Sequence, residues 1–224
     1  MKRVERLFVL WRDQTQSRRV VGELWRTAEG FAFGYSDELP SESDGFMPPA
    51  EFPEIRRTSE PYRAAYLFPT FAQRIPGPGR PDRDRMLRDW GVLNADDVLE
   101  ILARSGGVQL TDRIELAEYR AEDDELREPV EFRIAGASQP RFSGAAKLVS
   151  VGDRLGLKRE PENTHDRFAT IVLEGAGAAL GYVPKQYSRM VARLLDSGVA
   201  LAATAQRLLV SPDAGRWVVR LTRA

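Results

Sequence analysis

The sequence predicts an α+β protein of two small domains, a sheet with helices followed by a barrel-like β domain with one helix. Its 224 residues suffice for one large domain or two small ones. An acidic stretch at residues 118–129 ends at Pro129 and is typical of a linker, with a solvated loop inside one domain as the alternative. The net charge changes sign there, because residues 1–128 carry 19 basic and 25 acidic side chains and residues 129–224 carry 14 and 8. We expect domains at residues 1–117 and 130–224, the second a candidate for binding polyanions.

In the first domain, short apolar runs separated by turn residues predict a small antiparallel sheet. A loop rich in Ser, Pro, Glu and Asp follows at residues 36–61, and residues 61–75 then show helix-like spacing that Pro69 interrupts. Two short helices come next, the second ending at Gly106-Gly107. The remaining predicted elements are strands at residues 7–11, 20–26, 31–35 and 112–116, and helices at 82–90 and 96–105.

The second domain is rich in strands, with one helix. Alternating or short apolar runs predict the strands, and Gly175-Ala-Gly177 predicts a hairpin turn between two of them. Pro184 opens a helix that ends at Gly198. Several short strands with one helix indicate a small barrel-like domain. The strands are expected at residues 130–134, 155–157, 170–173, 180–183, 201–210 and 217–222, with a turn at 211–215, and the apolar face of the helix consists of Tyr187, Met190, Val191, Leu194 and Leu195.

Composition excludes several kinds of site. The chain has no cysteine and a single histidine, so neither a disulfide framework nor a zinc site rich in sulfur or nitrogen is expected. Glu160 and Asp166 could exchange protons, but no nucleophile, base and oxyanion donors converge, and no nucleotide-binding loop is present. We therefore expect no enzyme, metal or cofactor. The longest early apolar run, Leu7 to Trp11, is too short for a signal peptide or a membrane span, which favours a cytoplasmic protein without membrane contact.

The helix of the second domain carries a second, basic stripe. Lys185, Arg189 and Arg193 follow one another at intervals of four residues, so they project from one side of the helix. Phosphates could align along such a stripe, and Lys185 lies in the first turn, where backbone N–H groups also favour anions. An ordinary solvated charged face is the alternative.

Three segments of the second domain form a recognisable pattern: Gly136-Ala-Ser-Gln-Pro-Arg-Phe142, Arg159-Glu-Pro-Glu-Asn163-Thr-His-Asp166 and Gly181-Tyr-Val-Pro184. Together they resemble the HIRAN domain, a family known from DNA-repair translocases and from bacterial proteins. The resemblance covers about residues 130–210 and implies an OB-like barrel that binds single-stranded DNA at a free 3′ end.

The resemblance also implies roles for individual residues. Asp166 would accept a hydrogen bond from a terminal 3′-hydroxyl, and His165 would occupy the position of a base-stacking aromatic side chain. Phe142 would be a second stacking surface, and Arg141, which takes the place of another aromatic residue, can also stack on a base. Tyr182 and Lys185 would contact the nucleic-acid backbone. The expected nucleic-acid-binding residues are Arg141, Phe142, Arg159, His165, Asp166, Tyr182, Lys185, Arg189 and Arg193.

The first domain has a pattern of its own in Leu67–Pro76, Arg80-Pro-Asp82 and Leu99–Gly107 followed by Thr111-Asp112. These segments resemble the N-terminal subdomain of HipA-like kinases. A kinase core is missing from the sequence, so the resemblance implies a domain for contacts with a kinase-like or other protein partner. Apolar surface left by that missing core is expected among Tyr62, Tyr66, Phe68 and Phe71.

Two functions follow from these patterns. The first is a non-catalytic bacterial protein whose second domain binds single-stranded DNA or DNA ends, as in DNA repair, and whose first domain contacts protein. The alternative is a regulatory or antitoxin-like subunit of a split HipA-like kinase, as in toxin–antitoxin systems.

Overall fold

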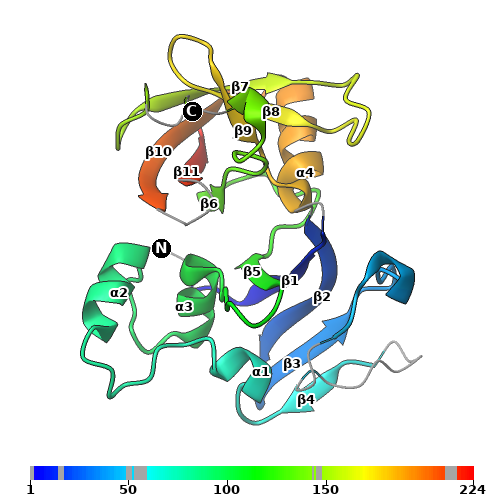
Figure 1. The fold of residues 1–224 in the computed structure, drawn as a ribbon, viewed down its shortest axis with the longest axis vertical. Coiled ribbons are helices and arrows are strands. Elements are labelled where there is room, and N and C mark those ends of the chain that lie inside the picture. The colour runs from blue at the N-terminus through cyan, green and yellow to red at the C-terminus, as the bar shows by residue number, and fades with distance from the viewer. Residues whose placement is uncertain are drawn as a thin grey trace. The chain divides into compact units, whose positions relative to one another are not determined.

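The computed structural model describes residues 3–14, 18–48, 52, 60–142, 144, 148–209 and 216–224 (Figure 1). The chain forms two compact units, Met1–Tyr119 and Arg120–Ala224. The division falls inside the acidic stretch, so residues 120–129 belong to the second unit. Both units combine a sheet with helices, and the predicted α+β class is confirmed.

The first unit contains a five-stranded antiparallel sheet in the order β4-β3-β2-β1-β5. The strands expected at residues 7–11, 20–26 and 31–35 form, with slightly different ends. The helix-like spacing predicted from residue 61 is wrong at its start, because this part of the chain pairs with the edge of β3 and places Tyr62 opposite Phe33. The strands are β1 (Arg6–Arg12), β2 (Arg18–Thr27), β3 (Gly30–Tyr35), β4 (Tyr62–Ala64) and β5 (Ile114–Glu118).

The helices of the first unit are α1 (Pro69–Ala72), α2 (Arg83–Trp90) and α3 (Val98–Ser105), together with the short 3-10 helix η1 (Glu42–Asp44). Leu99 and Leu102 of α3 are fully buried in one core with Phe33 and Phe71. Of the four aromatic side chains expected to leave apolar surface, Phe71 is buried and Tyr62 and Phe68 pack partly against this core, whereas Tyr66 is 84% exposed.

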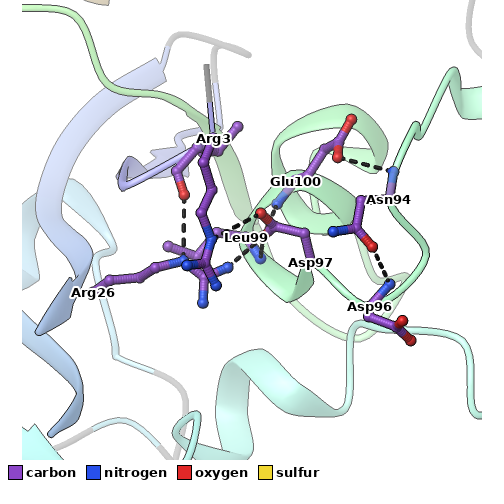
Figure 2. Close-up of polar contacts among 8 residues, drawn as sticks. Arg3, Arg26, Asn94, Asp96, Asp97, Leu99 and Glu100 are labelled. Carbon is purple, nitrogen blue, oxygen red and sulfur yellow. Dashed lines mark hydrogen bonds and ion pairs between the residues drawn. The ribbon is translucent and has the colours of Figure 1, made fainter. Parts of the chain in front are cut away.

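A buried carboxylate anchors the start of α3 (Figure 2). Asp97 is only 4% exposed, and its side chain accepts hydrogen bonds from the backbone N–H groups of Leu99 and Glu100. It also forms ion pairs with Arg26 of β2 and, at 3.5 Å, with Arg3. This single side chain therefore caps the helix and ties it to the sheet.

The second unit contains a six-stranded sheet in the order β6-β11-β10-β7-β8-β9. The sheet curls until its first and last strands meet, where Ala135 and Tyr182 exchange two backbone hydrogen bonds of 2.8 Å. The predicted barrel-like domain is thus confirmed. Its elements are β6 (Val130–Arg133), the 3-10 helix η2 (Pro140–Phe142), β7 (Arg154–Arg159), β8 (Thr170–Leu173), β9 (Ala179–Tyr182), α4 (Lys185–Asp196), β10 (Leu201–Leu209) and β11 (Arg216–Arg223).

Helix α4 buries the predicted apolar face and exposes the predicted basic one. Tyr187, Met190, Val191 and Leu194 are buried, and the ring of Tyr187 lies 6.2 Å from that of Phe132 on β6. The hairpin predicted at residues 175–177 also forms, closed by the side chain of Glu174, which accepts hydrogen bonds from the N–H groups of Ala176 and Ala178. The predicted turn at 211–215 lies outside the described residues.

Within the described ranges, none of the helices has the length and apolar character needed to cross a membrane. The same residues contain no group of three or more His, Asp or Glu side chains arranged to hold a metal ion.

Candidate nucleic-acid interface

The point where the sheet of the second unit closes fixes the position of Tyr182. The residue before it, Gly181, has a positive φ of 138°, and a Cβ atom there would lie 2.5 Å from the carbonyl oxygen of Ala135. Glycine lets the two backbones approach this closely because it has no Cβ atom. It also adopts this φ, which other residues rarely do. Closure therefore sets Tyr182 against the loop at residues 136–142.

The hydroxyl of Tyr182 is the centre of a polar network. It donates a hydrogen bond to Glu160 Oε2 at 2.8 Å, and it accepts hydrogen bonds from Arg141 Nη2 at 2.6 Å and from Asn163 Nδ2 at 3.4 Å. Partial burial, and then the hydrogen bond to Glu160, raise the pKa of Tyr182 above its ordinary value. The hydroxyl consequently remains a neutral donor at physiological pH.

Arg141 places an exposed cation against two aromatic rings. Its guanidinium carbon lies 4.6 Å from the ring centre of Phe142 and 5.2 Å from that of Tyr182. Stacking and the hydrogen bond to the Tyr182 hydroxyl hold the group in place, while the residue itself is exposed. A planar cation held in this way can stack on a base or pair with a phosphate.

Asn163 shapes the loop between β7 and β8. Its Oδ1 accepts hydrogen bonds from the N–H groups of His165 and Asp166, at 3.0 and 3.2 Å, while its Nδ2 donates to Glu160 at 3.2 Å. Asp166 continues the turn, because its Oδ1 accepts a hydrogen bond of 2.9 Å from the N–H of Phe168. Among the described residues, the second carboxylate oxygen of Asp166 has no hydrogen-bond donor. The loop thus presents an exposed imidazole beside an available carboxylate oxygen.

Two predicted site residues have different roles in the structure. Phe142 is 3% exposed and packs edge-on against Tyr182, with 5.6 Å between ring centres, so the exposed stacking surface is Arg141 rather than the phenyl ring. Arg159 pairs with Asp196 at 3.0 Å and donates to the carbonyl of Ala169 at 2.6 Å. These contacts fasten the β7–β8 loop to the end of α4, which makes Arg159 a structural residue.

The basic stripe of α4 is partly paired within the second unit. Lys185 is exposed and forms no ion pair with any residue that the structure describes. Arg189 forms an ion pair of 2.8 Å with Glu122, and Arg193 forms one of 3.1 Å with Glu125. The predicted stripe exists, but two of its three charges already face carboxylates.

Sequence reasoning missed the roles of Glu160 and Asn163 as the groups that hold the Tyr182 network and the loop together. Both lie inside the segment whose spacing carried the family resemblance. Asparagine in a turn often accepts hydrogen bonds from nearby backbone N–H groups through its side chain. This preference could have identified Asn163 from the sequence.

Residues 130–214 match the family model of the HIRAN domain. The second unit carries a HIRAN domain. The match does not extend to the first unit, whose likeness to HipA-like kinases stays a prediction.

Sequence similarity to a curated protein is limited to one segment. Over 74 residues, 33% of this chain, the sequence is 38% identical to the Fanconi-associated nuclease 1 homolog of Arabidopsis thaliana, and the match spans only 8% of that protein.

Two solved structures were also matched, each at 19% sequence identity. The crystal structure of the HIRAN domain of human HLTF gives a TM-score of 0.37 and covers 44% of this chain and 76% of that chain. A protein from Lactobacillus plantarum gives a TM-score of 0.36 and covers 43% of this chain and 100% of that chain.

Proposed function

We propose that the second unit binds single-stranded DNA at the surface formed by Arg141, Asn163, His165, Asp166 and Tyr182, called here the loop surface. One observation carries the proposal most directly: the exposed guanidinium of Arg141 lies against the Phe142 and Tyr182 rings and is held there by its hydrogen bond to the Tyr182 hydroxyl. The HIRAN match over residues 130–214 supports a DNA-binding role, because this family is known for binding nucleic acid.

The chemistry of the loop surface suits a single strand. Bases stack on planar cations and on aromatic rings without regard to sequence, and Arg141 and the exposed His165 supply both kinds of surface. Arginine also binds phosphate through two parallel hydrogen bonds, so Arg141 can serve either part of a nucleotide. Double-stranded DNA offers no unstacked base for such a surface.

Asp166 is proposed to favour a free 3′ end. The Asp166 carboxylate oxygen that has no donor among the described residues can accept a hydrogen bond from a terminal hydroxyl. It would repel the phosphate of a continuing strand, since two negative groups at contact distance disfavour each other. Hydroxyl ends would therefore bind better than phosphorylated ends.

Fluorescence anisotropy of a 5′-labelled oligothymidylate with the full chain tests the proposal. We expect Arg141→Ala to raise Kd about fivefold to tenfold, corresponding to about 1 kcal/mol for a lost stacking surface. Arg85→Ala is the matched control, because this first-unit side chain is 70% exposed and its one ion pair within the described part of the chain is a 3.9 Å contact with Asp82. Equal Kd values for the two variants, or no binding by the wild type, would overturn the proposal.

End selectivity has its own test. Asp166→Asn keeps an oxygen for the N–H of Phe168 and removes the charge. It is expected to reduce the preference for a 3′-hydroxyl over a 3′-phosphate more than it reduces overall affinity. A wild-type protein that binds both ends equally would refute the role of Asp166.

A further inference from the structure

An acidic segment, residues 122–125, lies against the basic stripe of α4. Glu122 accepts a hydrogen bond from Arg189 Nη1 at 2.8 Å, and Glu125 accepts one from Arg193 Nη1 at 3.1 Å. Arg193 also donates to the backbone carbonyls of Glu122, at 3.1 Å, and Asp124, at 2.7 Å. Four hydrogen bonds therefore hold this short acidic segment against two arginines of α4.

The basic stripe of α4 adjoins the loop surface through Phe168. The guanidinium carbon of Arg189 lies 5.3 Å from the ring centre of Phe168, and the N–H of Phe168 donates to Asp166 of the loop surface. Arg193 follows Arg189 by one turn of α4. A strand held at the loop surface and running along α4 would therefore meet Arg189 and then Arg193.

We infer that the acidic segment is an internal competitor of DNA, occupying on Arg189 and Arg193 the positions that phosphates would take. The inference rests on the proposed function. Carboxylate and phosphate oxygens accept the same guanidinium hydrogen bonds, so both cannot be satisfied at once. Binding of a strand along α4 displaces residues 122–125, and the full affinity of the stripe appears only after this displacement.

The exposure of these ion pairs makes displacement feasible. The side chains of Arg189 and Glu122 are 60% and 69% exposed, and ion pairs between exposed groups contribute little to stability. A polyanion that reaches several cations together can replace such contacts. The segment thus lowers affinity without closing the site.

The chain offers a matched control within the same acidic stretch. Asp123 and Glu128 are exposed and, among the described residues, make no side-chain hydrogen bond or ion pair. Glu122→Gln/Glu125→Gln and Asp123→Asn/Glu128→Gln remove two negative charges each from neighbouring positions. The two double variants differ in whether the lost carboxylates contact α4.

The experiment measures oligothymidylate binding by both double variants of the full chain at several salt concentrations. We expect Glu122→Gln/Glu125→Gln to lower Kd about threefold to tenfold relative to the control pair. The variant removes the ion pairs of Glu122 with Arg189 and of Glu125 with Arg193, as well as the 3.7 Å pair of Glu125 with Arg223. Its slope of log K against log salt should also be steeper by about 0.7 for each arginine that gains a phosphate. Because both double variants lose the same charge, a difference between them reports the contacts of Glu122 and Glu125 with α4.

Arg189→Ala, made in the wild type and in the Glu122→Gln/Glu125→Gln background, provides a second readout. Competition predicts a larger loss of affinity in the neutralised background, where Arg189 is available to DNA. Equal Kd values for the two double variants would overturn the competition. If Arg141→Ala still weakens binding in that case, the proposed function stands. Absence of binding by every variant overturns both.

Discussion

Replacing Tyr182 with phenylalanine removes one oxygen atom and keeps the ring beside Arg141. The lost hydroxyl donates to Glu160 at 2.8 Å and accepts from Arg141 at 2.6 Å and Asn163 at 3.4 Å. Hydrogen bonds to charged groups contribute about 1.5–3 kcal/mol where water is excluded. Water reaches this surface and can solvate the groups left behind, so we expect the free energy of unfolding of the second unit to fall by about 1 kcal/mol.

Urea unfolding followed through the NMR amide signals of β8 and β9 reports this change for the second unit separately from the first. Tyr66→Phe is the control, since that tyrosine is 84% exposed in the first unit. Affinity for oligothymidylate should drop about fivefold in Tyr182→Phe, because Arg141 loses the bond that holds it in place. A variant equal to the wild type in both stability and affinity would refute the role of the network.

The difference in stability between wild type and Tyr182→Phe should also depend on pH. Burial and Glu160 raise the pKa of Tyr182 above 10.0, so the folded state holds this proton more tightly than the unfolded chain. The contribution of the hydroxyl to stability is complete below the unfolded pKa and is lost as the pH rises through the folded pKa. The stability difference between wild type and Tyr182→Phe should therefore shrink in alkaline solution.

Substitutions at three further positions test which contacts stabilise the fold. Asp97→Ala should lower the free energy of unfolding of the first unit by about 3 kcal/mol in urea titrations, because it uncaps α3 and leaves Arg26 without its buried partner; Asp97→Asn should cost less. Gly181→Ala should destabilise the second unit by about 2 kcal/mol or more, since its Cβ would meet the Ala135 carbonyl; thermal unfolding at the wild-type temperature would contradict this. Backbone N–H groups lower the pKa of Glu174, so the stability that separates wild type from Glu174→Ala should be present above pH 4.5 and vanish in acid.

Local patterns were sufficient to predict much of the second unit. The alternation of Val130, Phe132 and Ile134 gives a strand with one buried face, and Gly175-Ala-Gly177 gives the hairpin. The apolar spacing of α4 predicts which side of the helix enters the core. These features depend on neighbours within a few residues, so a single sequence contains the information.

The candidate site depends more on contacts between distant residues. Arg159 pairs with Asp196, 37 positions away, and Arg189 pairs with Glu122, 67 positions away. Charge patterns alone do not reveal such partners, which is why Arg159 and the basic stripe looked free in the sequence. Phe142 was misassigned for a related reason, since an aromatic residue in a polar loop can fill the core as readily as it can face solvent.

In the first unit, short segments were the hardest to assign. Tyr62–Ala64 is too short to show a strand period, and its aromatic spacing imitated a helix. Pairing with β3 decided the outcome, and this pairing is a property of the folded sheet rather than of the segment.

Hydrogen–deuterium exchange of the full chain, with and without a saturating single-stranded oligonucleotide, tests the central claim most directly. If DNA binds at the loop surface, amides of residues 136–142 and 160–169 should exchange more slowly in the complex. Exchange across the sheet of the first unit should not change. Protection confined to the first unit, or no protection anywhere at concentrations that saturate binding, would contradict it.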